Sequence, residues 1–160
     1  MHVVLDTNVV VSGLLSETGA PGWILDLALA GELELSLDDR ILAEYREVLL
    51  RPELALPEGA VQEFLGAIER LARRVTARPW PQALPDPDDE PFLTVAGAAG
   101  AVLVTGNLRH FPAAKRGGVQ VLSPREFLDL LRAVDREEIE ARAEARAESR
   151  AEYFSASEEE

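Results

Sequence analysis

Short apolar runs alternate with amphipathic segments along the chain, and this alternation predicts the architecture. Residues 3–5, 33–37, 101–105 and 119–122 have the character of strands. The first and third of these runs lack polar alternation, as expected of strands that are buried on both faces of a sheet. Segments with helical spacing lie between the runs. The chain therefore predicts an α/β fold with a mostly parallel central sheet flanked by helices.

Turn and cap residues set the expected bounds of the helices. Gly31 is typical of a helix C-terminus, Asp38 of an N-cap, and Ser123-Pro124 of a helix start. A short strand over 75–77 and an extended proline-rich connection over 78–87 are also expected. The remaining expectations are a loop over 16–22 and helices over 23–30, 39–50, 60–74 and 88–99.

The end of the chain differs in composition from the rest. From Glu140 to Glu152 the sequence repeats Ala-Arg-Ala-Glu and has almost no apolar stripe. Such a segment favours a solvated helix, with Glu and Arg three and four residues apart, or a frayed end. We therefore expect a globular domain over 1–133 and an acidic, helix-prone C-terminal extension over 134–160.

The composition of the chain excludes several kinds of metal site and catalytic residue. The chain has 160 residues, no cysteine and two histidines, which excludes disulfides, thiolate zinc sites, cysteine nucleophiles and a His-rich metal site. There is no run of 18 apolar residues and no basic segment ahead of the first apolar run, so we expect a cytoplasmic protein without a membrane partner. The net charge is −13, and such a protein does not attract nucleic acid by its overall field.

Polar residues follow the two buried runs directly. Asp6 ends the first run, and Thr105 to Asn107 end the run that begins at Ala101. If the two runs are neighbouring parallel strands, these residues share a crevice with Glu44 and with the acidic turn over 86–90. Carboxylates gathered in this way repel one another unless a cation joins them, and hard cations prefer oxygen ligands. The pattern favours a metal-dependent phosphodiesterase.

The same residues resemble the PIN domain family, whose members are Mg²⁺- or Mn²⁺-dependent ribonucleases and in many cases toxins of bacterial toxin–antitoxin pairs. The resemblance covers about residues 2–133. It rests on the order and spacing of four motifs, which are Val4-Leu5-Asp6-Thr7-Asn8-Val9-Val10-Val11-Ser12, Leu42-Ala43-Glu44-Tyr45-Arg46-Glu47-Val48-Leu49, Asp86-Pro87-Asp88-Asp89-Glu90-Pro91-Phe92-Leu93 and Val102-Leu103-Val104-Thr105-Gly106-Asn107.

The resemblance implies a catalytic set of Asp6, Glu44, Asp89 and Asn107. The three acids would be metal ligands for Mg²⁺ or Mn²⁺, and Asp89 begins a helix whose dipole favours the carboxylate. Many relatives have a further acid at the position of Asn107 or three residues later, where this chain has His110, so Mn²⁺ is favoured. Supporting positions are Thr7, Asn8, Asp88 and Thr105, and Asp88 is an alternative ligand to Asp89.

The expected partners follow from the same resemblance. They are an RNA substrate, an antitoxin protein and a second copy of the chain in a homodimer. A local basic rim for the substrate is expected from Arg109, Lys115 and Arg116, although a solvated loop explains these residues equally well. His110 is a further candidate for contact with the substrate, and a structural or surface role is the alternative.

Other functions fit the sequence less well. A haloacid dehalogenase-like phosphatase would need a second Asp where Asn8 stands, and a receiver domain would need an acidic pair near the first strand. No phosphate-binding P-loop and no dinucleotide glycine motif follows the first strand. The main alternative is a PIN-like RNA- or protein-binding module that cleaves poorly.

Overall fold

The computed structural model describes residues 1–16 and 18–157, in two compact units. The first unit covers Met1–Glu126, and the second begins at Phe127. Glu17 of the predicted loop and residues 158–160 of the predicted extension lie outside the described residues.

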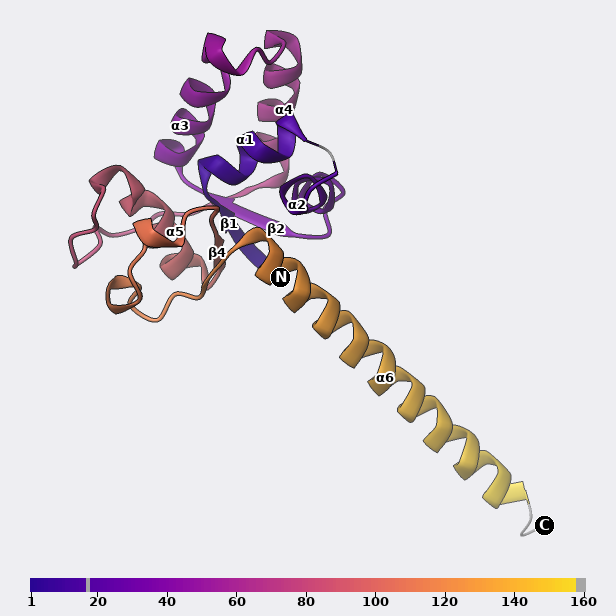
Figure 1. The fold of residues 1–160 in the computed structure, drawn as a ribbon. Helices are drawn as coiled ribbons and strands as arrows, with labels where there is room; N and C mark the ends of the chain where they lie inside the picture. Colours follow the sequence, from indigo (N-terminus) through magenta and orange to yellow (C-terminus); the bar gives the residue numbers. More distant parts are fainter. Residues whose placement is uncertain (17, 158–160) are drawn as a thin grey trace. The chain divides into compact units, whose positions relative to one another are not determined.

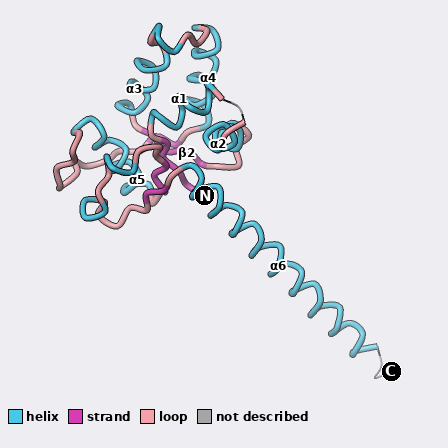
Figure 2. Tube along the Cα trace, viewed as in Figure 1, coloured by secondary structure: helices cyan, strands magenta, loops and turns pink. Residues whose placement is uncertain are grey.

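A five-stranded sheet forms the centre of the first unit, and all of its strand pairs are parallel. Figure 2 shows the strands gathered between helices. The strand order is β3-β2-β1-β4-β5, where the strands are β1 (His2–Leu5), β2 (Glu34–Leu37), β3 (Arg73–Arg74), β4 (Val102–Val104) and β5 (Val121–Leu122). The predicted α/β fold is therefore confirmed.

The pairing of β1 with β4 determines where the chemistry lies. Val3 pairs with Val102 and Leu5 with Val104, so both strands end at the same level. Beyond the pairing, the Asp6 amide donates to the Val104 carbonyl at 2.9 Å. The expectation that these two strands are adjacent and parallel is confirmed.

Helices cover both sides of the sheet. In Figure 1, α1–α4 are grouped on one side of the strands and α5 lies on the other. Helix α5 contacts β1, β2 and β4, whereas α3 and α4 contact β2. The bounds are α1 (Thr7–Leu15), α2 (Ala20–Leu29), α3 (Asp39–Leu49), α4 (Glu58–Leu71) and α5 (Glu90–Ala99), with single 3₁₀ turns at Pro52–Leu54, Pro87–Asp89, Leu108–His110 and Ala113–Lys115.

The predicted caps are present. Asp38 accepts a hydrogen bond from the Ile41 amide at 3.0 Å and so begins α3. Gly31 follows α2 with a φ of +78°, a backbone conformation that side chains disfavour. The Glu126 amide donates to Ser123 Oγ at 3.1 Å, and the Ser123 amide donates to Glu126 Oε1 at 3.2 Å. The last of these pairs is a capping box.

Some of the sequence-based bounds are wrong. Thr7–Leu15 is a helix that the apolar run did not predict, and α2 begins at Ala20, inside the predicted loop. The strand expected over 75–77 lies instead at Arg73–Arg74, because the chain joins the edge of β2 as soon as α4 ends at Leu71. Pairing with a neighbouring strand overrides local pattern at such edges.

Helix α6 (Pro124–Ser157) belongs largely to the second unit. It passes through residue 134 without a break, so no change of secondary structure marks the predicted boundary after residue 133, which stays a prediction. Among the helices that the structure describes, none has the length and apolar character needed to cross a bilayer.

Candidate active site

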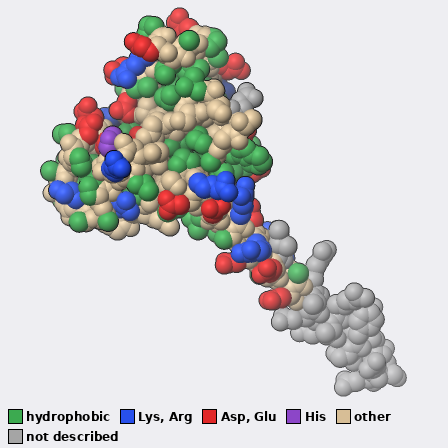
Figure 3. Space-filling view, viewed as in Figure 1, with side chains coloured by type: hydrophobic (Ala, Val, Ile, Leu, Met, Phe, Trp, Pro, Cys, Tyr) green, Lys and Arg blue, Asp and Glu red, His purple; other side chains and the backbone are tan. Residues whose placement is uncertain are grey.

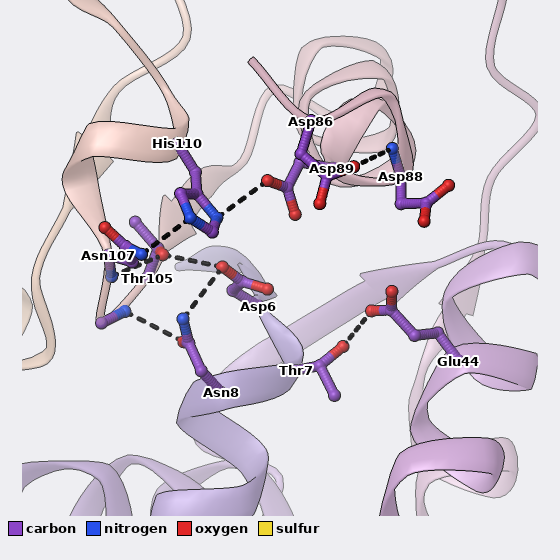
Figure 4. A network of polar contacts seen from close by, with 11 residues as sticks. Asp6, Thr7, Asn8, Glu44, Asp86, Asp88, Asp89, Thr105, Asn107 and His110 are labelled. Carbon is purple, nitrogen blue, oxygen red and sulfur yellow. Dashed lines mark hydrogen bonds and ion pairs between the residues drawn. The ribbon is translucent and has the colours of Figure 1, made fainter. Parts of the chain in front are cut away.

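Three carboxylates from separate elements line one cavity beside the carboxyl ends of the strands. Asp6 follows β1, Glu44 lies on α3, and Asp89 immediately precedes α5. All three line an open cavity of about 400 Å³. Figure 4 shows their side chains pointing toward a common space. Open α/β sheets bind ligands at this edge.

Asp6 is held by neighbouring side chains and does not cap a helix. It occupies the N-cap position of α1, yet its side chain makes no capping bond. Its Oδ2 atom accepts from Thr105 Oγ1 at 2.7 Å and from Asn8 Nδ2 at 3.3 Å. Only 5% of the residue is exposed. Polar partners thus orient the Asp6 carboxylate, and the residue lines the cavity.

Glu44 is positioned through the residue that follows it. The buried Tyr45 hydroxyl donates to the Leu5 carbonyl and joins α3 to the end of β1. Burial raises the pKa of the Tyr45 phenol, so it stays a hydrogen-bond donor. Thr7 donates to the Glu44 carboxylate from the start of α1. Thr7 therefore contacts a predicted ligand directly, and its supporting role stays a prediction.

Asp89 begins α5 without capping it. The cap of the preceding 3₁₀ turn is Asp86, which accepts from the Asp88 amide at 2.9 Å. Asp89 is left free to face the cavity and is 9% exposed. Its Oδ2 atom lies 3.0 Å from His110 Nδ1, but it has no hydrogen bond of good geometry among the described residues.

A chain of polar contacts connects Asp6 to Asp89 through Thr105, Asn107 and His110. Thr105 donates to Asp6, and the backbone amide of Asn107 donates to Thr105 Oγ1 at 3.0 Å. The side-chain nitrogen of Asn107, Nδ2, lies 2.8 Å from His110 Nε2. The other ring nitrogen of His110, Nδ1, lies 3.0 Å from Asp89 Oδ2. Figure 4 shows the whole series of contacts.

The electrostatics of the three carboxylates are those of a crowded anionic site. Burial raises the pKa of Asp6, and burial with the neighbouring Asp6 charge raises the pKa of Glu44. Burial and the charge of Asp6 raise the pKa of Asp89 to about 6. The sequence suggested that the dipole of α5 would favour the charged form of Asp89. The raised pKa shows the opposite balance, because the loss of solvent around the carboxylate outweighs the dipole.

The donor set suits a hard divalent cation. Ionised carboxylates are acceptor-only groups, and Asp89 Oδ2 is buried without a hydrogen-bonded partner among the described residues. As the side chains are arranged in residues 1–16 and 18–157, no three acids or histidines form a metal-binding group. Glu44 is engaged by Thr7, and Asp89 faces His110. The ligand assignments remain predictions.

The predicted supporting residues Asn8, Thr105 and Asp88, and Asn107 of the predicted catalytic set, differ in their placement. Asn8 lines the cavity, and its Oδ1 accepts from the Gly106 amide at 3.0 Å, joining α1 to the loop after β4. Thr105 and Asn107 belong to the polar chain described above and do not line the cavity. Asp88 lines a neighbouring hollow that it shares with Glu44, and it does not line the cavity of Asp6 and Asp89.

Of the predicted substrate-binding residues, His110 lines the cavity, and Arg109, Lys115 and Arg116 of the expected basic rim do not. Arg116 donates from Nε to the Phe111 carbonyl at 2.8 Å, and the Lys115 carbonyl accepts from Trp80 Nε1 at 2.9 Å. These contacts shape the loop after β4 rather than the cavity wall.

Sequence reasoning missed one charged residue of the cavity. Arg51 lines it together with Val48 of α3 and with Val11 and Ser12 of α1. The signal was present in the spacing, because residues 44, 48 and 51 recur on one face of a helix. It was overlooked because Pro52 ends the helical pattern directly after Arg51.

A family model described as the PIN domain matches residues 2–109. The chain therefore belongs to the PIN domain family, and the resemblance drawn from its motifs is confirmed. Over 117 residues it is 30% identical to the uncharacterized protein MJ1680 of Methanocaldococcus jannaschii. The match covers 67% of this chain and 71% of that protein.

Solved structures with the same fold are more distant in sequence. PAE2754 from Pyrobaculum aerophilum superposes with a TM-score of 0.54 at 18% identity, over 83% of this chain and 90% of that chain. FitAB bound to the IR36 DNA fragment superposes with a TM-score of 0.52 at 19% identity, over 76% of this chain and 94% of that chain. VapBC2 from Rickettsia felis, bound to a DNA fragment from its promoter, superposes with a TM-score of 0.50 at 14% identity, over 77% of this chain and 98% of that chain. These likenesses show the fold alone.

Proposed function

We propose that this PIN domain protein is a divalent-metal-dependent ribonuclease that hydrolyses RNA phosphodiester bonds. The observation that carries the proposal is the cluster of Asp6, Glu44 and Asp89, three acids of raised pKa that line one cavity. Burying like charges together is unfavourable for the folded protein, and such arrangements are concentrated at functional sites.

The three acids would hold Mg²⁺ or Mn²⁺. When bound, such an ion activates water and neutralises charge that develops on the phosphate. The protein's contribution is orientation: Thr105 fixes Asp6, and Thr7 holds Glu44 near the cavity. Asn107 acts through His110, whose ring nitrogens face Asn107 and Asp89.

The proposed reaction has no covalent enzyme intermediate. Cysteine is absent from the sequence, and the single lysine, Lys115, does not line the cavity. Ser12 does line it, but both nitrogens of His110 already face other side chains and are not available as a base for that hydroxyl. The nucleophile that we propose is water.

We also propose that the protein is the toxin of a toxin–antitoxin pair and acts in the cytoplasm. Its partners would be an antitoxin protein and a second copy of the chain. The support is membership of the PIN domain family together with the fold shared with VapBC2 and FitAB. Co-purification of the protein with the product of a neighbouring gene, and its mass in solution, test these two partners separately.

The activity is tested by incubating the purified protein with structured and single-stranded RNAs in Mn²⁺, in Mg²⁺ and in EDTA. Asp6→Asn should abolish cleavage without unfolding the protein, and EDTA should abolish it for the wild type. Asp88→Asn is the matched control, because Asp88 is an exposed acid next to Asp89 that does not line the cavity.

Cleavage that survives EDTA, or an Asp6→Asn protein as active as the wild type, would contradict the mechanism. If no RNA is cleaved but RNA or protein is bound without a metal requirement, the binding-module alternative holds instead. Mn²⁺ is expected to support higher activity than Mg²⁺, because it binds mixed oxygen and nitrogen sites more tightly.

A further inference from the structure

An RNA substrate faces an electrostatic difficulty at this site. The protein carries a net charge of −13, and three acids line the cavity. On the face drawn in Figure 3, acidic and basic side chains of the first unit are interspersed, and no broad basic field is seen. Binding therefore depends on local cations, since neutralised phosphates dominate affinity for nucleic acids.

Arg51 is the sole lysine or arginine among the described residues that line this cavity. It comes directly after Leu50, the C-cap of α3, and its backbone is fixed on both sides. The Arg51 amide donates to the Val48 carbonyl at 3.1 Å, and the Arg51 carbonyl accepts from the Leu54 amide at 3.1 Å. The side chain therefore projects from a rigid point of attachment.

The side-chain partner of Arg51 is weak. Arg51 Nη2 lies 3.5 Å from Glu47 Oε1, and the two side chains are 55% and 74% exposed. Exposed pairs of this kind contribute little to stability, so exchanging the carboxylate for a phosphate costs little. A guanidinium also presents paired donors that match phosphate oxygens.

The position of Arg51 decides which phosphate it meets. Glu44, Val48 and Arg51 line the cavity from one face of α3 and its end, and Thr7, Val11 and Ser12 line it from α1. Arg51 is seven residues beyond Glu44, which corresponds to about 10 Å along a helix axis. Among the described residues, the Arg51 guanidinium pairs with Glu47 and not with any of the three acids, which places it beside the phosphate at the carboxylates rather than on it.

We propose that Arg51 binds a backbone phosphate of the RNA substrate that flanks the scissile one, in the groove between α1 and α3. This inference rests on the proposed ribonuclease function and deepens it. It makes Arg51 a substrate-binding residue that contributes to affinity for longer RNA and takes no part in the chemistry.

The test measures RNA binding in an Asp6→Asn background, which prevents cleavage. A labelled single-stranded RNA of about 12 nucleotides is titrated by fluorescence anisotropy over a series of salt concentrations. Arg51→Gln is compared with Arg46→Gln, a matched control on α3, the helix that Arg51 follows. Arg46 is exposed, pairs with Glu69 at 3.5 Å and does not line the cavity.

Arg51→Gln should weaken binding by about fivefold to tenfold at low salt, and should lower the slope of log K against log salt by about 0.7, the value for one contact with a single strand. Arg46→Gln should change neither quantity. In the otherwise wild-type enzyme, Arg51→Gln should raise KM for the long RNA and leave kcat, and all cleavage of a dinucleotide, unchanged.

Equal affinities and salt slopes for the two variants would overturn the role of Arg51 and leave the ribonuclease proposal intact. Loss of dinucleotide cleavage in Arg51→Gln would also overturn it, because Arg51 would then act at the scissile phosphate or on the fold. If the wild type neither binds nor cleaves any RNA, the proposed function itself fails, and the inference fails with it.

Discussion

Removing the charge of Asp89 should stabilise the metal-free protein, because the folded state holds this carboxylate in an unfavourable environment. Burial and the charge of Asp6 raise its pKa from 3.8 to about 6. A difference of that size corresponds to at most about 3 kcal/mol of destabilisation at neutral pH. The cavity is open to solvent and the charges of Asp6 and Asp89 depend on each other, so we expect Asp89→Asn to stabilise by about 1–2 kcal/mol.

The sign of the pH dependence follows from the same shift. The folded state binds a proton at Asp89 more tightly than the unfolded state does, so the free energy of unfolding should increase as pH falls through about 6 toward 3.8. Asp6 and Glu44 have raised pKa values and act in the same direction. Asp89→Asn should therefore reduce, but not abolish, the gain in stability on acidification.

Urea unfolding in EDTA, followed by circular dichroism at about pH 7.5 and about pH 5, measures both effects. Asp88→Asn serves as the control, and it should alter stability by less than about 0.5 kcal/mol because Asp88 is exposed. The reasoning is refuted if Asp89→Asn is less stable than the wild type near pH 7.5, or if the two respond identically to acidification.

Two further substitutions test the contact between α3 and β1 and the packing of the loop after β4. Tyr45→Phe removes the buried hydroxyl that binds the Leu5 carbonyl and should destabilise by about 1–2 kcal/mol in thermal unfolding, whereas an unchanged midpoint would show that the bond adds nothing. Gly117→Ala should destabilise by about 1–3 kcal/mol, because Gly117 has a φ of +55° and an added Cβ would lie 2.8 Å from Trp80. Gly59→Ala in α4, where nothing lies within 4 Å, should be neutral or slightly stabilising, and equal effects of the two alanines would contradict the packing argument.

The fold was predictable because its signals are local. Buried parallel strands are continuous apolar runs, and caps such as Asp38 act within one turn of a helix. Helix α1 was not predictable in this way, because Val9, Val10 and Val11 give no clear helical period and favour strands when considered alone. The contact of α1 with α2 and α3 stabilises it as a helix.

The three acids of the candidate site were predicted from three of the four motifs, but the contacts that support them could not be found in that way. The contacts of Thr105, Asn107 and His110 depend on side-chain rotamers and on the register of β1 against β4. Arg51 reaches the cavity because α3 lies beside α1. Such relations between distant segments arise only from tertiary packing.

The central claim is that Asp6, Glu44 and Asp89 together bind a divalent ion. Titration of the metal-free protein with Mn²⁺, with free Mn²⁺ followed by electron paramagnetic resonance, tests it without depending on any RNA. The account predicts saturable binding by the wild type and by Asp88→Asn, and binding weaker by about tenfold or more in Asp6→Asn and Asp89→Asn. Equal Mn²⁺ affinity in the wild type and in Asp6→Asn would contradict it.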